Sequence, residues 1–474
     1  MKTIKQSLFF NTVARIVTEI FNRFGAAIFW VLVARYLGVS ALGALAFALS
    51  LHSFFLAIST FGLGAVLIRD VARDRSLAGL YLAQCLAFGS VLATVAAAVM
   101  VGFAWISGSV GDTLIVTSIL AAALVPSSIF YWSKSLLTAA EQMHKIAFAR
   151  LIENSVKVVA GVTLLFCGGT ILEMAFILFL SKTVSAIILF MDVRRKIKPI
   201  WRIDRPLLVY FARLAPSFGL TSLGNCLFWT MPVILLARLA GDYQAGLFAA
   251  AYKLVDVAVS FSLAYGQALF PVAARSAKDI SGQFRSLLTK SVKYSLMLSP
   301  AIAIGLVMLA HPLIRFIYGT SMLESAPVLS LLAWMLIPFS LVPVLAYSLV
   351  SRHLQRYDVF ANTIAACLVI GLGFALVPSL GARGTALSIV AGTLVYCSIE
   401  WIGVRRNIYR LSLSKHIWKP ACASFVMAGV LYFFNNSYLL FAIALAGVTY
   451  VISLILSKAI TKRELLIIKR LKPV

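Results

Sequence analysis

The chain has 474 residues, of which 61% are hydrophobic and only 12% are charged, and its mean hydropathy is +0.97. A soluble domain is usually about 45–50% apolar and about 25% charged, so this composition excludes a soluble enzyme and a disordered protein. There are 42 Lys and Arg against 16 Asp and Glu, a net charge of +26. In a membrane protein this charge is expected to set topology, and we expect no nucleic-acid partner.

Apolar runs long enough to cross a bilayer follow one another along the whole chain, broken by charges, Gly and Pro. We predict an all-α integral membrane protein with about 14 transmembrane helices and no soluble domain on either side. The predicted spans are 13–34, 42–65, 80–105, 113–137, 149–167, 171–191, 208–236, 246–270, 291–310, 326–350, 359–378, 384–404, 417–434 and 438–457.

The loops between these spans differ strongly in charge. If the N-terminus is cytoplasmic, the inside segments hold 28 Lys and Arg and the outside loops hold 4. Because cytoplasmic loops are enriched in Lys and Arg, this bias predicts that both the N- and the C-terminus are cytoplasmic.

An internal repeat is visible at an offset of 203 residues. The segment 33–38 resembles 236–241, and Gly43 falls on Gly246. Since the offset equals six helices, an even number, the repeat is predicted to be parallel rather than inverted. The predicted parts are an N-lobe of helices one to six (1–199), a C-lobe of helices seven to twelve (200–410), and helices thirteen and fourteen with a basic cytoplasmic tail (411–474).

Ionisable residues inside the predicted spans are the candidate functional groups. A charge at the bilayer centre costs about 2.5–3.5 kcal/mol on insertion scales, so each is expected to face a polar cavity or a partner. Lys182 and Arg213 have no acid within one turn, and such cations suit a diphosphate or an acidic sugar. The predicted substrate-binding residues are Arg15, Arg23, Lys157, Lys182, Arg213 and Lys253, and the candidate ion-coupling carboxylates are Glu19, Glu153 and Asp256.

Helical spacing leaves a second interpretation open for several of these charges. Glu153 and Lys157 are four residues apart, and Lys253 and Asp256 are three apart, so either pair equally fits a neutral bridge between helices. Lys134 lies near a cytoplasmic helix end, where snorkelling explains it as well as cavity lining does.

Sequence patterns of catalysis are missing. No Gly-Lys dipeptide occurs, which excludes a P-loop, and neither H-E-x-x-H nor G-x-S-x-G is present. We therefore expect a protein that is not an enzyme and that carries no metal and no cofactor.

Three motifs resemble a known family. The turn at 34–43, the close of the eighth helix at 267–271 and the segment 377–388 are similar to those of polysaccharide-lipid flippases of the O-antigen type, in the multidrug/oligosaccharidyl-lipid/polysaccharide exporter superfamily. The resemblance implies that an undecaprenyl-diphosphate-linked oligosaccharide is moved from the cytoplasmic to the outer leaflet of the plasma membrane, the bacterial inner membrane. It also implies two lobes that rock about a central cavity. The transported oligosaccharide would serve the synthesis of a surface polysaccharide.

Two other functions remain open at this point. One is an ion-coupled multidrug or small-molecule exporter of the same superfamily, and the other is a membrane glycan polymerase or ligase. The basic interior argues against the first, and the missing long outside loop argues against the second. The partners expected from the resemblance are a lipid-linked oligosaccharide, membrane lipids, and polysaccharide polymerase or assembly proteins.

Overall fold

The computed structural model describes residues 2–202, 204–276, 282–409, 414–434, 439–457 and 459, except for the side chains of 2–24, 26, 221 and 414–416. Within these residues the chain consists of α-helices and short 3₁₀ turns, with no strand. It divides into two compact units, Met1–Ala249 and Ala250–Val474. An all-α fold follows because a backbone in lipid must satisfy its own hydrogen bonds.

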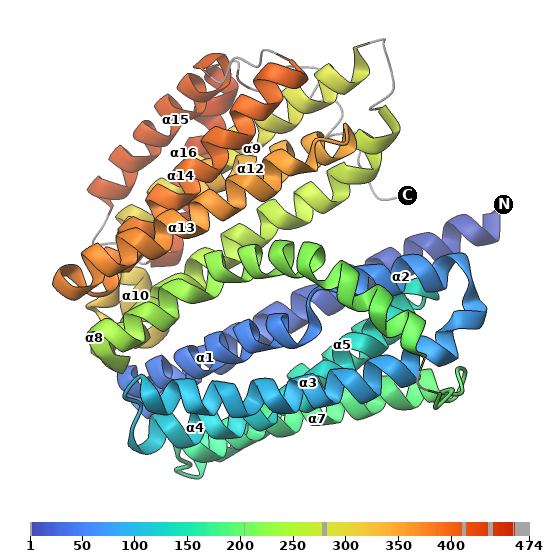
Figure 1. Ribbon diagram of the computed structural model, residues 1–474. Coiled ribbons are helices and arrows are strands. Elements are labelled where there is room, and N and C mark those ends of the chain that lie inside the picture. The colour runs from blue at the N-terminus through green and yellow to red at the C-terminus, as the bar shows by residue number, and fades with distance from the viewer. Residues whose placement is uncertain are drawn as a thin grey trace. The chain divides into compact units, whose positions relative to one another are not determined.

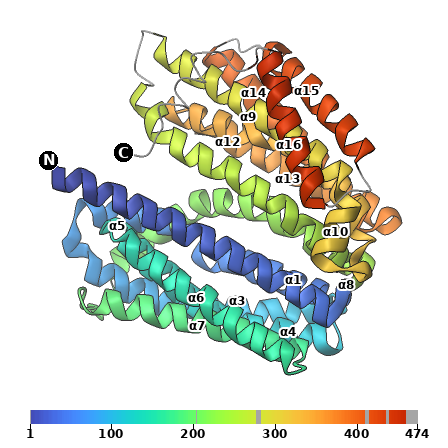
Figure 2. The same ribbon diagram turned by 180° about the vertical axis from the view of Figure 1, so that it is seen from behind.

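The first unit is built on the long helix α1 (Lys2–Thr60). Its other helices are α2 (Gly64–Arg73), α3 (Ala78–Ile106), α4 (Gly111–Ala122), α5 (Leu124–Ala139), α6 (Met143–Phe166), α7 (Ile171–Arg194) and the first part of α8 (Arg205–Ser276). The 3₁₀ turn η1 (Arg75–Leu77) joins α2 to α3. In Figure 2 α6 lies along α1 and α7, and α5 packs between α3 and α7.

The second unit contains the rest of α8 and the C-terminal helices. They are α9 (Gln283–Met308), α10 (Ala310–Tyr318), α11 (Ser325–Ala333), α12 (Leu336–Ser351), α13 (Gln355–Leu380), α14 (Ala382–Asn407), α15 (Ser414–Phe433) and α16 (Leu439–Leu456), with the 3₁₀ turn η2 (Thr320–Met322). Figure 1 shows α13 and α14 side by side. They form a hairpin that turns at Gly381, and α12 packs against α14.

The repeated turn has the same backbone in both copies. Gly38 in α1 has φ 84° and ψ −178°, and Gly241 in α8 has φ 85° and ψ 169°. L-residues rarely adopt this region, so glycine is needed to join two helices at each kink. The two glycines are 203 residues apart, the offset that the sequence repeat predicts.

The two copies also touch each other reciprocally. A Cβ on Gly43 would lie 1.8 Å from the Asp242 carbonyl oxygen, and a Cβ on Gly246 would lie 2.0 Å from the Val39 carbonyl oxygen. Residues 39 and 43 correspond to 242 and 246 at the repeat offset. Such a mutual contact is what a local two-fold relation between parallel repeats produces.

All fourteen predicted spans fall on helical segments. Nine helices of the described residues are long and apolar enough to cross a membrane, or ten if the bent pair α11 and α12 is one span. Two of the nine are long merged helices that each hold two predicted spans, kinked at Gly38 and Gly241. The count of fourteen, the cytoplasmic termini and the lobe bounds 1–199, 200–410 and 411–474 stay predictions, as does the basic tail, of which 460–474 lie outside the described residues.

Candidate functional site

A cation-rich cavity lies inside the first unit. Its volume is about 170 Å³, and its walls come from α1, α5, α6 and α7. Helical spacing places its lining residues on one face of each helix, since residues three or four apart point the same way. The lining side chains are Leu56, Ser127, Phe130, Tyr131, Lys134, Arg150, Glu153, Lys182 and Ser185. Three cations therefore face one carboxylate.

Lys182 stands in the middle of α7, partly exposed to this cavity. Its ammonium group is attracted by the charge of Glu153 and repelled by that of Arg150. Within the part of the chain that the structure describes, no hydrogen bond or ion pair within 4.0 Å engages its ammonium group. Arg150 is exposed, lies 5.6 Å over the Phe130 ring, and also acts on Lys134. Positive charge in the cavity thus exceeds what its one acid can balance.

The cavity wall is held by polar contacts behind it. The buried His52 ring bonds the Leu120 carbonyl oxygen through Nδ1 at 2.9 Å and Ser127 Oγ through Nε2 at 3.1 Å. A carbonyl oxygen only accepts, so Nδ1 carries the hydrogen and Ser127 donates to Nε2. Lys145 Nζ lies 3.3 Å from Asp192 Oδ1 and ties the start of α6 to the end of α7.

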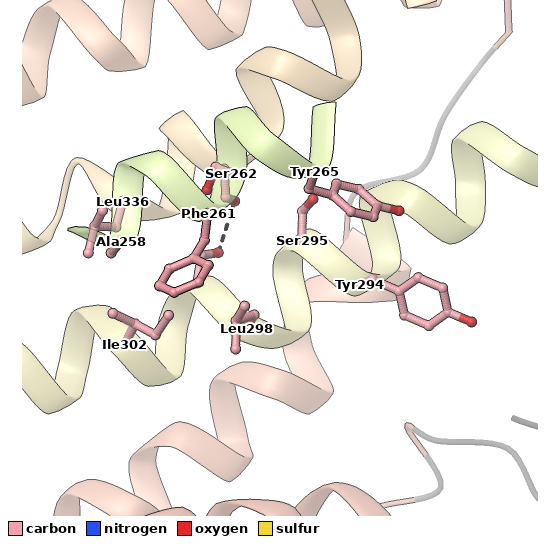
Figure 3. A pocket seen from close by; sticks show the side chains of 11 residues that line it. Ala258, Phe261, Ser262, Tyr265, Tyr294, Ser295, Leu298, Ile302 and Leu336 are labelled. Atoms are coloured by element: carbon pink, nitrogen blue, oxygen red, sulfur yellow. Dashed lines mark hydrogen bonds between the residues drawn. The ribbon is translucent and has the colours of Figure 1, made fainter. Parts of the chain in front are cut away.

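A second, uncharged cleft lies in the second unit between α8, α9 and α12 (Figure 3). It measures about 260 Å³. Partly exposed aromatic rings and hydroxyl groups line it, with one hydrogen bond of 3.0 Å from Ser340 Oγ to Ser299 Oγ. The lining side chains are Ala258, Phe261, Ser262, Tyr265, Tyr294, Ser295, Leu298, Ser299, Ile302, Leu336 and Ser340. Rings with a few hydroxyls bind neutral ligands that have both apolar and hydroxyl faces.

The predicted site residues fall into different environments. Lys182 and Glu153 share the cationic cavity. Lys157 lies outside its lining, where its Nζ donates to Asn154 Oδ1 at 2.6 Å and lies 5.7 Å from the Phe29 ring centroid.

Lys253 and Asp256 attract each other on α8 in the second unit, as expected for a pair three residues apart. Arg213 is exposed on α8, beside Ala212 and Ala215, which line an apolar groove of about 420 Å³. The side chains of Arg15, Glu19 and Arg23 lie outside the described residues.

Sequence reasoning missed Arg150 and left Lys134 open between snorkelling and cavity lining; the structure places Lys134 in the cavity lining. Arg150 stands at the second residue of the predicted span 149–167, where a charge is expected to reach water. The available signal was its spacing of three residues from Glu153. Among the described residues, no group of three or more His, Cys, Asp and Glu is placed to hold a metal ion.

Outside the predicted spans, helix α2 carries a carboxylate that accepts several hydrogen bonds. Asp70 accepts hydrogen bonds from Arg69 Nε at 2.8 Å, Tyr81 Oη at 3.0 Å and Tyr210 Oη at 3.1 Å. Burial by itself raises the pKa of Asp70, but these three donors outweigh it and hold the pKa below its ordinary value. This contact anchors α2 to the start of α8.

Comparison with known proteins gives a family and a curated relative. The family described as "Polysaccharide biosynthesis protein" matches residues 5–277. The succinoglycan biosynthesis transport protein ExoT of Rhizobium meliloti (strain 1021) is 25% identical over 312 residues, which are 64% of this chain. The match spans 60% of the length of that relative.

Solved structures share the fold. The structure of the lipid II flippase MurJ in its inward closed conformation superposes with a TM-score of 0.82 at 16% identity, over 96% of this chain and 100% of that chain. An inward-facing multidrug resistance transporter of the MATE family in the MOP superfamily gives 0.66 at 15% identity, over 82% and 94%. At these identities the likeness shows the fold of a multi-pass membrane transporter. The named proteins are transporters or flippases rather than enzymes.

Proposed function

Because this chain belongs to the polysaccharide biosynthesis protein family, we propose that it is a flippase for a lipid-linked oligosaccharide. The substrate is an oligosaccharide on undecaprenyl diphosphate, moved from the cytoplasmic to the outer leaflet of the bacterial inner membrane for surface polysaccharide synthesis. The observation that carries this proposal is the cavity of the first unit, where Lys134, Arg150 and Lys182 face Glu153 alone.

The charge of this cavity suits a diphosphate. A guanidinium binds phosphate oxygens through two parallel N–H donors, and an ammonium acts as a mobile point charge. Arg150 and the two lysines offer both kinds of donor. The volume of about 170 Å³ is several times the roughly 30 Å³ share of one water molecule, so a phosphate-sized group fits. An organic cation would meet repulsion at the same place.

The cleft of the second unit has, by itself, the chemistry of a site for neutral sugars. Sugar rings present C–H faces to aromatic side chains and hydroxyls to serines, and the cleft supplies Phe261, Tyr265 and Tyr294 beside Ser262 and Ser295. Its lining has no charge, so it accepts neutral sugars and does not compete for the diphosphate.

Movement of the two repeats completes the proposal. The two lobes are residues 1–199 and 200–410, and residues 411–474 lie outside the repeat. Rocking of the lobes gives alternating access to the two leaflets. The reciprocal contact of Gly43 and Gly246 supports a pivot at the repeated turn, since no side chain stands between the two backbones. The same proposal includes five further substrate contacts, at Arg15, Arg23, Lys157, Arg213 and Lys253. Its partners are polysaccharide polymerase or assembly proteins.

The test is translocation in proteoliposomes. A fluorescent undecaprenyl-diphosphate oligosaccharide is placed in one leaflet, and its appearance in the other is followed with a membrane-impermeant quencher. We expect the intact chain to move the lipid and Lys182→Gln to move it about tenfold more slowly, as loss of one charge-assisted hydrogen bond of about 1.5 kcal/mol predicts.

Lys290→Gln is the matched control, because Lys290 is an exposed lysine of α9 and its loss changes the net charge equally. It should move the lipid at the intact rate. Failure of the intact chain to move the lipid, together with transport of an organic cation, would refute the flippase proposal in favour of a multidrug exporter.

A further inference from the structure

Two carboxyl groups, one fully buried and one half-buried, lie between α13 and α14, far along the chain from the cationic cavity. Glu400 on α14 has no exposed surface. Asp358 stands in the first turn of α13 and bonds Tyr396, which lies one helical turn before Glu400 on α14, so the charges of the two acids act on each other. Because α13 and α14 pack against each other as a hairpin, Glu400 lies inside the protein, whereas Asp358 keeps part of its surface exposed.

The hydrogen bonds around the pair leave acceptors without donors. Tyr396 Oη donates to Asp358 Oδ1 at 2.9 Å, and Asn362 Nδ2 donates to Tyr396 Oη at 3.4 Å. Both oxygens of Glu400 and Oδ1 of Asn362 are buried and have no partner among the described residues. An unpartnered buried acceptor is costly, and an unpartnered buried carboxylate far more so.

The helices packed against Glu400 supply no positive charge to it. From α14 itself the neighbouring titratable groups are Tyr396 and Cys397, and from α13 it is Asp358. Helix α12 brings Tyr347, which senses the charge of Asp358, and α11 has no titratable residue.

The nearest arginine along α14 is engaged elsewhere. Arg405 is exposed, and its guanidinium lies 5.4 Å over the ring of Trp401. In the described part of the second unit, therefore, no Lys, Arg or His is found to act on the Glu400 carboxyl group.

We propose that Asp358 and Glu400 hold one proton between them and form a proton-binding site in the second unit. A hydrogen bond between two carboxyl groups requires a proton on one of them, and like charges this close do not both ionise. The proton gives Glu400 a donor, with Asp358 as its acceptor. Tyr396, one turn before Glu400 on α14, donates a hydrogen bond to Asp358 and holds it in place.

This site differs from the three acids that the sequence singled out, Glu19, Glu153 and Asp256. It lies in another pair of helices, where Glu400 is fully buried and Asp358 is half-buried. Release of the proton would place a fully buried anion beside a second anion, which favours any conformation that hydrates them. The proton is thus linked to the packing of this hairpin, whatever substrate the chain carries.

Infrared spectroscopy of the purified full-length chain tests the site directly. The C=O stretch of a protonated carboxyl group, identified by its shift in D₂O, is recorded at a series of pH values from 5 to 9. We expect one such band to persist at neutral pH in the intact chain, to be lost in Glu400→Gln, and to shift in frequency in Asp358→Asn, where Glu400 stays buried but loses its acidic neighbour. Asp112→Asn, which changes an exposed acid of α4, should keep the band.

Thermal unfolding separates a proton from a metal cation. The melting temperature of the intact chain should fall as pH rises from 6 to 9, because deprotonation leaves buried anions without a cation. Glu400→Gln resembles the protonated acid and should melt at the intact temperature at pH 6 with a flatter decline above it. Persistence of the band in Glu400→Gln overturns the proposal. So does a rise in melting temperature on replacing K⁺ by Na⁺ that Glu400→Gln abolishes, because the pair would then bind a cation.

Discussion

The cationic cavity of the first unit and the acid pair of the second unit handle charge in opposite ways. Lys134, Arg150 and Lys182 border an open space of about 170 Å³, where water or an anionic ligand reaches them. Glu400 has no exposed surface and faces another acid. Charges that border a cavity can bind counter-charges, whereas an acid buried beside another acid is stable only when a proton neutralises it. We propose that the first arrangement binds the substrate and that the second binds a proton.

The largest effect is expected from reversing one charge of the cationic cavity. Lys182→Glu changes three cations against one acid into two against two. We expect translocation of a diphosphate-linked lipid to fall roughly 100-fold, because a bound phosphate loses a charge-assisted bond of about 1.5–3 kcal/mol. Proteoliposome flux measures it. Lys290→Glu is the control on an exposed lysine, and an equal drop in that variant would remove the cavity from the explanation.

The next largest effect is expected from removing the Tyr396 hydroxyl, which donates to Asp358 of the acid pair. Tyr396→Phe leaves Asp358 without its donor, and we expect a loss of about 1–3 kcal/mol in stability, seen as a lower melting temperature in detergent. The loss should grow as pH rises, because a deprotonated pair depends more on that donor. Tyr432→Phe, at a ring that is 72% exposed, should leave the melting temperature unchanged. A pH-independent loss contradicts the shared proton.

Keeping the charge but changing its shape is a milder test of the cavity. Arg150→Lys preserves the cation and loses the planar fork and its position over Phe130. We expect translocation to fall about 3- to 10-fold, less than in Lys182→Glu. Arg383→Lys, at an exposed arginine next to the α13–α14 turn, should have no effect. If Arg150→Lys and Arg150→Gln reduce translocation equally, it is the fork and not the charge that matters.

The smallest effect is expected at Asp70, whose surroundings are intermediate between those of the cavity cations and those of Glu400. Asp70 is half-buried, as Asp358 is in the second unit. Unlike the acid pair, it accepts hydrogen bonds from Arg69, Tyr81 and Tyr210, so it stays ionised. Its pKa is lowered in the folded chain. The stability it adds is therefore present above the unfolded pKa of about 3.9 and is lost as pH falls through the lower folded pKa.

Thermal unfolding at pH values from 3 to 6 measures this contribution. We expect Asp70→Asn to melt slightly below the intact chain at pH 6 and to lose less stability on acidification. Asp74→Asn is the matched control, because Asp74 is an exposed acid directly after α2 whose side chain bonds only Ser76. A larger acid sensitivity in Asp70→Asn than in the intact chain would contradict the assigned role of its donors.

Sequence alone predicted the class of fold and the family. The motifs at 34–43, 267–271 and 377–388 predicted a resemblance that the family match and the shared fold confirm. The repeat offset of 203 residues reappears in the matched backbones of Gly38 and Gly241. Such features are predictable because hydropathy and glycine requirements act locally along the chain.

The candidate site was predicted only in part, because it depends on which helices meet. Lys134, Glu153 and Lys182 were recognised as intramembrane charges, but periodicity did not show that their three helices meet at one cavity, nor that Arg150 of α6 joins them.

The acid pair shows the same limit. The sequence placed Asp358 in the cytoplasmic loop 351–358, one residue before the predicted span, whereas α13 begins at Gln355. Contact between Asp358 and Glu400, which are 42 residues apart, follows from the turn of the hairpin at Gly381 rather than from periodicity.

The most direct test of the central claim is the preference for a diphosphate linkage. Translocation of one oligosaccharide is measured in proteoliposomes on undecaprenyl diphosphate and on undecaprenyl monophosphate, with the intact chain and with Lys182→Gln. A cationic cavity that binds the linkage predicts faster movement of the diphosphate lipid by the intact chain and a smaller preference in the variant. Equal rates for the two lipids, or a preference that Lys182→Gln retains in full, would contradict it.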